Sequence, residues 1–151
     1  NEYELLLHND INSHGYTQWF YFRVRNTQKC RARLRICNVI KPPHHFRRGM
    51  KISVFSLEQK RQCNRNWFKA GDGIVCRKNN IVRKTRSDEH EHYYSLEFSY
   101  HFEYPNDTVY FAMNVPFSYS RLMRLLKHIE QQDKHPDVYV SGNAALSKSV
   151  V

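Results

Sequence analysis

One stretch decides the fold: Thr17-Gln18-Trp19-Phe20-Tyr21-Phe22-Arg23-Val24-Arg25, the densest apolar and aromatic segment of the chain. Its residues alternate in character with a period of two, which is typical of a half-buried β-strand. One face of the predicted strand carries Phe20, Phe22 and Val24. The opposite face carries Trp19, Tyr21, Arg23 and Arg25.

A second alternating run, Arg31-Ala32-Arg33-Leu34-Arg35-Ile36, follows after Asn26 to Cys30. A link of that length suits a hairpin loop. Folding the two runs about Gln28 would bring their apolar residues onto one shared face. The predicted cross-strand pairs are Val24 with Ala32, Phe22 with Leu34, and Phe20 with Ile36.

The same hairpin would gather five arginines on its other face. They are Arg23, Arg25, Arg31, Arg33 and Arg35. Like charges directly opposite each other are unfavourable, so this face is predicted to be either a well-solvated surface or a site for an anionic partner. Guanidinium groups bind carboxylates with two parallel hydrogen bonds, which makes these arginines the candidate substrate-binding residues.

Composition fits one folded domain and excludes a disordered chain. Of the 151 residues, 40% are hydrophobic and 14% are aromatic, a balance that favours β-structure. The formal net charge of +10 is unevenly spread. The segment from Arg23 to Arg86 holds 19 of the 24 Lys and Arg residues but only two of the 14 acidic ones. Such a field attracts polyanions, including nucleic acid, anionic lipid and acidic peptide tails.

The four cysteines have neither zinc-ribbon spacing nor the density of a disulfide scaffold, so we predict reduced thiols in a cytosolic protein. Cys63 and Cys76 have no identifiable paired base, so we predict that neither is a nucleophile. The sequence shows no apolar run near 18 residues and no leader, which predicts neither a membrane span nor a signal peptide. A start without Met indicates a piece of a longer protein.

Further alternating segments predict more strands. They lie at Tyr3–Leu7, Ile52–Leu57, Tyr94–Phe102 and Val109–Val115, with a short hairpin formed by Ile74–Arg77 and Ile81–Lys84. Lys41–Met50 is predicted to be a loop, Asn64–Gly73 an irregular stretch, and Ser87–His92 a solvated turn. The predicted fold class is therefore all-β, an antiparallel β-sandwich of about seven to nine strands followed by one C-terminal amphipathic helix.

The predicted helix begins after a capping serine, Ser118 or Ser120, and ends before Pro136. Its apolar residues follow helical spacing at Leu122, Leu125, Leu126 and Ile129. The sequence thus divides into a sandwich over residues 1–117 and a helix with a connector over residues 118–151.

Two motifs are especially specific: Thr17-Gln18-Trp19-Phe20-Tyr21-Phe22 and Pro116-Phe117-Ser118-Tyr119-Ser120. Other matching positions are Asn9-Asp10-Ile11-Asn12, Asn26, Asn38, Lys41-Pro42, Gly49-Met50, Trp67, Gly71, Lys78-Asn79, Tyr93-Tyr94-Ser95-Leu96 and Tyr110-Phe111-Ala112. In this order and spacing they resemble the N-terminal domain of the cytosolic carboxypeptidases, from about Tyr3 to Leu126.

The resemblance implies a β-sandwich that directly precedes a zinc metallocarboxypeptidase domain, to which the connector would lead. Members of that family remove glutamates from acidic protein tails, notably those of tubulin. The implied partners are the chain's own catalytic domain and polyglutamylated tails, in the cytoplasm and at microtubules or cilia. The five arginines would either gather such tails or pair with acidic residues of the catalytic domain.

The resemblance also implies where zinc would bind. The family holds its catalytic zinc with a His-x-x-Glu pair and a distant His, and uses a separate Glu as general base. None of the nine histidines here has Glu three residues later, so we expect no cofactor in this chain and zinc in the absent catalytic domain. The chain alone is expected to hydrolyse nothing. His44-His45 and His90-Glu91-His92 are interpreted as solvent-facing histidines.

Two function classes stay open at this point. One is an accessory domain of a protein deglutamylase. The other is a nucleic-acid or polyanion-binding sandwich, which the basic segment alone would permit. Phosphate-driven binding would be strong and steeply salt dependent, whereas an accessory domain would bind DNA weakly and without specificity. The resemblance favours the first class, with no specific nucleic-acid partner and no membrane.

Overall fold

The computed structural model describes residues 1–13, 15–17, 19–25, 27–41, 44–84 and 89–132. The chain divides into two compact units, Asn1–Val115 and Pro116–Val151. The predicted connector after the helix and part of the predicted Ser87–His92 turn lie outside the described residues.

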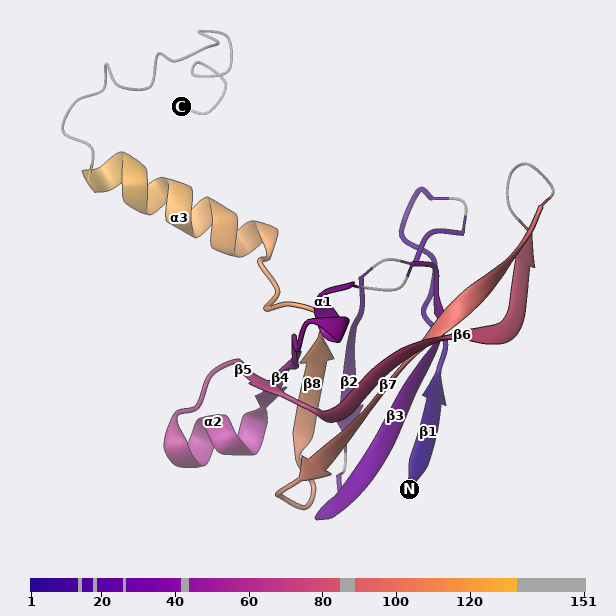
Figure 1. Cartoon of the computed structure of the whole chain (residues 1–151). Helices are drawn as coiled ribbons and strands as arrows, with labels where there is room; N and C mark the ends of the chain where they lie inside the picture. Colours follow the sequence, from indigo (N-terminus) through magenta and orange to yellow (C-terminus); the bar gives the residue numbers. More distant parts are fainter. Residues whose placement is uncertain (14, 18, 26, 42–43, 85–88, 133–151) are drawn as a thin grey trace, which may run out of the picture. The chain divides into compact units, whose positions relative to one another are not determined.

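Eight strands of the described residues form two four-stranded sheets (Figure 1). The first sheet has the order β1 (Glu2–Leu5), β3 (Cys30–Val39), β7 (His90–Phe102) and β6 (Asp72–Lys84). The second has the order β2 (Tyr21–Arg25), β8 (Thr108–Ala112), β4 (Ile52–Ser56) and β5 (Phe68–Ala70). All strand pairs are antiparallel except β1 with β3. The predicted all-β sandwich is confirmed.

The core lies between the two sheets and is built from the inward positions of the alternating strands. Phe111 on β8 is fully buried and contacts aromatic rings from both sheets. Its ring centroid is 5.2 Å from that of Phe22 in its own sheet and 5.1 Å from that of Tyr100 in the other. The inward direction of Phe20, Ala32, Leu34 and Ile36, all buried, follows the alternation in the sequence.

The predicted hairpin between Thr17–Arg25 and Arg31–Ile36 is wrong. β2 pairs with β8 in the second sheet, whereas β3 pairs with β1 and β7 in the first. A shared apolar face can be satisfied side by side in one sheet or face to face across a sandwich, and alternation alone does not distinguish the two arrangements. Thr27 anchors the connection, because its hydroxyl donates to the Tyr104 carbonyl at 2.8 Å and accepts from the Asp107 N–H at 3.2 Å.

The second predicted hairpin, about Lys78-Asn79-Asn80, is also wrong, because β6 runs through these residues as one strand with a register shift between Lys78 and Val82. The Asn79 side chain stabilises the shift. Its amide nitrogen donates to the Cys37 carbonyl at 2.6 Å and to the Ser95 hydroxyl at 2.9 Å, and its amide oxygen accepts from the Ile81 N–H at 2.9 Å. One side chain thus ties together β3, β6 and β7.

Sequence analysis missed two short helices and one strand. They are α1 (His44–Arg47), α2 (Leu57–Cys63) and β5. The signal for α2 was a capping serine, since the Ser56 hydroxyl accepts from the Gln59 N–H at 3.0 Å. The buried carboxylate of Asp107 binds the same helix start, accepting from the Ser56 hydroxyl at 2.5 Å and the Glu58 N–H at 3.1 Å.

The second unit contains α3 (Tyr119–Gln132), which confirms the predicted C-terminal helix. Ser118 rather than Ser120 is the cap, because its hydroxyl accepts from the Arg121 N–H at 3.3 Å. Among the described residues 116–132, none of the helix side chains is buried. No helix in the described part of the chain is long and apolar enough to cross a membrane.

Candidate functional site

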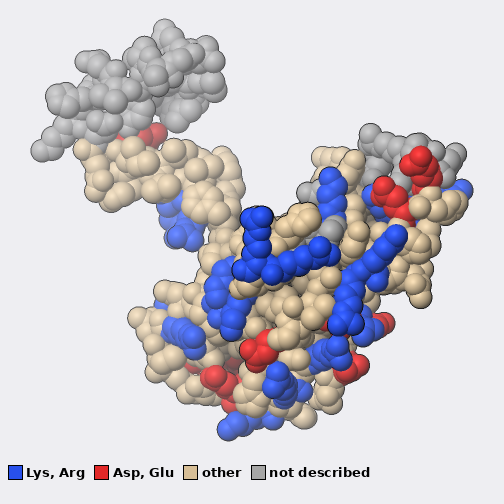
Figure 2. Space-filling view, in the orientation of Figure 1, with Lys and Arg blue, Asp and Glu red and all other residues tan. Residues whose placement is uncertain are grey.

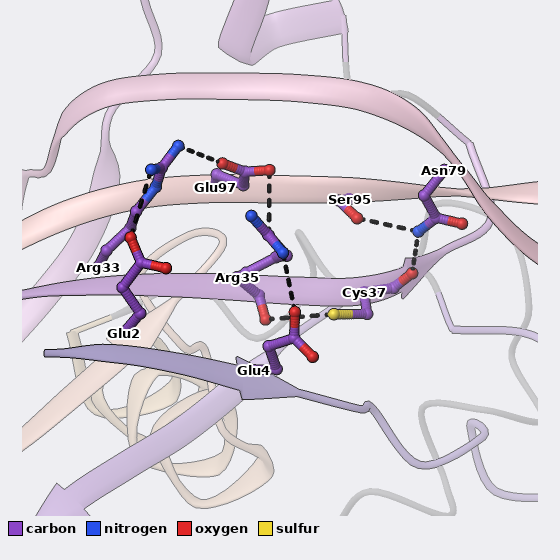
Figure 3. A network of polar contacts seen from close by, with 8 residues as sticks. All are labelled: Glu2, Glu4, Arg33, Arg35, Cys37, Asn79, Ser95 and Glu97. Atoms are coloured by element: carbon purple, nitrogen blue, oxygen red, sulfur yellow. Dashed lines mark hydrogen bonds and ion pairs between the residues drawn. The ribbon is translucent and has the colours of Figure 1, made fainter.

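The outer face of the first sheet carries a ladder of ion pairs centred on Arg33 and Arg35 (Figure 3). Glu97 on β7 accepts from Arg33 Nη2 at 2.6 Å and from Arg35 Nε at 3.1 Å. On the other side, Arg35 Nη1 donates to Glu4 at 2.8 Å, and Arg33 Nη1 lies 3.5 Å from Glu2. Carboxylates from two neighbouring strands therefore hold both guanidinium groups.

Strand register produces this ladder. The parallel pairing of β1 with β3 sets Glu2 beside Arg33 and Glu4 beside Arg35, and the β3–β7 pairing sets Arg35 opposite Glu97. The hydrogen bond that Arg35 donates to Glu4 and the charge of Glu97 raise the pKa of Arg35. Arg31, farther along β3, lies 3.6 Å from Asp72 on β6. The positive charge of this face is therefore largely compensated within the sheet.

The outer face of the second sheet has a different character, and we call it the aromatic–cationic face. It is formed by Trp19, Tyr21, Phe55, Trp67 and Tyr110, with Arg23, Arg25 and Lys69 beside them. Strand register brings β2, β8 and β4 together here, because Arg23 pairs with Tyr110 and Tyr110 with Phe55. The face therefore depends on strands that are distant in sequence.

The five rings form one continuous cluster. Tyr21 stacks on Tyr110 with an interplanar angle of 20° and a centroid distance of 5.9 Å. Trp67 lies 6.2 Å from Tyr21 and 5.5 Å from Phe55, and Trp19 lies 6.2 Å from Tyr21. Much of the cluster remains open to solvent, since Trp19 is 42% exposed and Tyr21 is 51% exposed.

Small residues lie buried beneath this cluster. Ser53 and Ala112 occupy outward positions, paired with each other, yet both are fully buried. The hydroxyl of Ser53 has no hydrogen-bond partner within the described residues. Lys69, the cross-strand neighbour of Ser53, has its pKa lowered by desolvation. Two outward-facing positions of this face are therefore already buried within the chain.

Charge on the aromatic–cationic face is not compensated. Among the described residues, the ion pairs within 4.0 Å involve Arg31, Arg33, Arg35, Arg61 and Arg83 only. Arg23, Arg25 and Lys69 therefore have no carboxylate at that distance in the part of the chain that the structure describes. Over the whole side of the molecule drawn in Figure 2, Lys and Arg side chains cover more of the surface than Asp and Glu side chains do.

The structure therefore separates the five predicted arginines. Arg31, Arg33 and Arg35 lie together on the first sheet, whereas Arg23 and Arg25 lie on the second, so a single five-arginine face is wrong. Their substrate-binding role stays a prediction. The outward direction of Trp19 and Tyr21 could be deduced from alternation, but the contribution of Phe55 and Trp67 could not, because it depends on strand pairing.

The described residues offer no zinc site. No group of three or more His, Cys, Asp or Glu side chains among them could hold a metal ion. The Nδ1 atom of His92 lies 2.9 Å from the Asn79 carbonyl oxygen, so this nitrogen already has a hydrogen-bond partner. These residues do not fit a catalytic zinc centre, and no hydrolytic step is assigned to them.

Within the described residues, neither the cysteines nor the cavity at one edge of the sandwich forms a catalytic arrangement. All four cysteines are free, and burial raises the pKa values of the Cys37 and Cys76 thiols, which disfavours the reactive thiolate. A cavity of about 530 Å³ lies at the edge where β1 and β3 approach β2. Its apolar lining residues include Leu5, Val24 and Leu34.

The chain is similar to several curated proteins. It is 37% identical over 130 residues to cytosolic carboxypeptidase 3 of Mus musculus, with 85% of this chain covered. It is 32% identical over 143 residues to cytosolic carboxypeptidase 1 of Homo sapiens, with 92% covered. It is 37% identical over 122 residues to cytosolic carboxypeptidase 2 of Homo sapiens, with 80% covered.

These similarities involve only a small part of each relative. The chain spans 12% of the length of the first two proteins and 13% of the third. No protein-family model matches the chain.

Proposed function

We propose that this chain, which belongs to the cytosolic carboxypeptidase family, is the non-catalytic N-terminal domain of a longer zinc metallocarboxypeptidase. In this proposal the β-sandwich supports the folding and position of a separate catalytic domain. That domain would hold the zinc and remove glutamates from acidic protein tails such as those of tubulin. The parent protein would act in the cytoplasm, at microtubules or cilia.

One observation carries the proposal: most of this chain aligns with about 12% of each relative. The aligned segment has its own hydrophobic core, within the unit Asn1–Val115. Its described residues provide no ligand set for zinc. A supporting domain linked to a catalytic one explains these three facts together.

The experiment that tests this proposal compares this chain with the parent protein that contains it. Each is purified, its bound zinc is measured, and release of glutamate from a polyglutamylated peptide is followed. We expect zinc and glutamate release only from the parent, and loss of release when the parent is treated with a chelator. Zinc-dependent glutamate release by the isolated chain would contradict a non-catalytic role. A parent that binds zinc but releases no glutamate would contradict the proposed activity.

A second candidate function is binding of a polyanion or nucleic acid. It is favoured by the exposed aromatic rings beside uncompensated arginines, since single-stranded nucleic acids bind through stacking and phosphate contacts. A salt series with the isolated chain distinguishes the candidates. Tight, steeply salt-dependent binding to DNA would favour this second function, whereas weak binding without sequence preference fits a supporting domain.

A further inference from the structure

The aromatic–cationic face has the composition of a protein-binding hot spot. Interface centres are enriched in Trp, Tyr, Phe and Arg and depleted in acidic residues. Both tryptophans of the chain, Trp19 and Trp67, lie on this face. A patch of this kind on an otherwise solvated sheet indicates a surface that is covered by a partner.

The face is also preorganised. Tyr21 and Tyr110 stack on each other, and Trp67 contacts both Tyr21 and Phe55, so the rings restrain one another before any partner binds. Side chains that are already ordered lose little conformational entropy on binding. Ser53 and Ala112, at outward positions of the same sheet, are already buried before any partner binds.

Charge specifies the chemistry of the partner. On the first sheet, Arg31, Arg33 and Arg35 each have a carboxylate from a neighbouring strand. On the aromatic–cationic face, the described residues supply none within 4.0 Å of Arg23 or Arg25. A partner with an apolar centre and acidic residues at its rim would complement this face.

We propose that the aromatic–cationic face is the docking surface for the catalytic domain of the parent protein, which contributes an apolar centre and an acidic rim. This inference rests on the proposed function. The chain spans about 12% of its relatives' length, so the partner would belong to the same polypeptide. A covalent link supplies an effective concentration on the order of millimolar, enough to hold a surface of modest size in place.

Nucleic acid fits this face less well. Base stacking needs free ring faces, and the mutual stacking of Tyr21 and Tyr110 occupies one face of each ring. The exposed area that remains is mainly Trp19 and the outer side of Tyr21.

The test is hydroxyl-radical footprinting, read by mass spectrometry, of the parent protein and of this chain at equal concentration. We expect Trp19 and Tyr21 to be oxidised several-fold more slowly in the parent. Tyr3, which is 53% exposed on the first sheet, is the internal control and should be oxidised at the same rate in both samples. The variant Arg23→Glu in the parent should return Trp19 oxidation toward the rate seen in the isolated chain.

Equal oxidation of Trp19 and Tyr21 in the two samples would overturn the docking proposal. Protection that disappears after nuclease treatment would also overturn it, because nucleic acid would then be the occupant. The docking proposal and the proposed function fail separately. A parent that releases glutamate with zinc but leaves Trp19 unprotected refutes only the docking surface, whereas a parent without glutamate release refutes the proposed function.

Discussion

At the scale of single residues, Asp107 is a buried carboxylate that joins the start of α2 to β8. It accepts hydrogen bonds from Ser56, Glu58 and Thr108. Asp107→Ala leaves these donors without an acceptor, so we expect the free energy of unfolding to fall by about 2–4 kcal/mol in urea titrations. The control Asp72→Ala removes an exposed carboxylate with one long ion pair, and it should lower the free energy of unfolding by about 0–1 kcal/mol. Equal losses for the two variants would contradict this role.

Ionisation of the Tyr100 phenol is expected to make the stability of the fold depend on alkaline pH. Burial, with smaller contributions from Glu103 and Asp107, raises the pKa of its phenol to about 12. An unfolded tyrosine titrates near pH 10, so above that pH the unfolded chain binds fewer protons than the folded one. Stability is therefore fully present below about pH 10 and falls toward pH 12, by roughly 2–3 kcal/mol from this group.

Tyr100→Phe removes this titration. We expect its free energy of unfolding, measured by urea titration at a series of pH values, to fall less steeply than that of the wild type above about pH 10. Tyr3→Phe, which removes an exposed phenol, is the matched control. If both variants follow the wild-type curve, ionisation of Tyr100 does not contribute to alkaline unfolding.

At the scale of elements, Asn79 determines whether β6 and β7 stay paired past the register shift. Figure 1 shows both strands continuing beyond the rest of their sheet, and the pairs there include Val82 with His92 and Lys84 with His90. Asn79→Ala removes three hydrogen bonds, so amide hydrogen exchange over residues 81–84 and 90–92 should become about tenfold faster or more. Asn80→Ala changes an exposed neighbour and should leave exchange unchanged. Similar exchange in the two variants would mean that the backbone alone maintains the shift.

The elements also show how far sequence reasoning reaches. Alternation correctly predicted which residues of Phe20–Val24 and Ala32–Ile36 face the core, because burial of one face requires a period of two. It did not predict which strands are neighbours. The assignment of β2 to β8 and of β3 to β1 and β7 depends on the packing of the whole sandwich, and the same apolar pattern satisfies either arrangement.

Prediction of the candidate site from the sequence was limited in the same way. All five arginines were correctly placed on outward faces, but their partners come from strands distant in sequence. Glu97 is 64 residues from Arg33, and its carboxylate nonetheless compensates both Arg33 and Arg35. Two of the predicted arginines instead border an aromatic cluster that no local pattern indicates, since its five rings come from β2, β4, β8 and the residues just before β2 and β5.

At the scale of the whole molecule, the two outer faces differ in charge compensation, and this difference underlies the proposed role. On the first sheet, Arg31, Arg33 and Arg35 each have a carboxylate within 4.0 Å, whereas among the described residues Arg23 and Arg25 on the second sheet have none. If the partner of Arg23 and Arg25 is the catalytic domain, these arginines contribute to the stability of the assembled parent. If it is an acidic substrate, they contribute to the KM for that substrate.

The most direct measurement compares the Tm of the parent protein and its KM for a polyglutamylated peptide before and after the double change Arg23→Glu and Arg25→Glu. Lys29→Glu with Lys78→Glu is the matched control, because it reverses two charges on exposed residues outside the aromatic–cationic face, and neither lysine has an ion pair among the described residues. The same variants in the isolated chain report any intrinsic loss of sandwich stability.

We predict that the double change Arg23→Glu and Arg25→Glu lowers the Tm of the parent by several degrees, while the KM of the parent and the Tm of the isolated chain stay unchanged. The control pair should change none of the three. A several-fold rise in KM with an unchanged parent Tm would contradict docking and would assign these arginines to substrate binding.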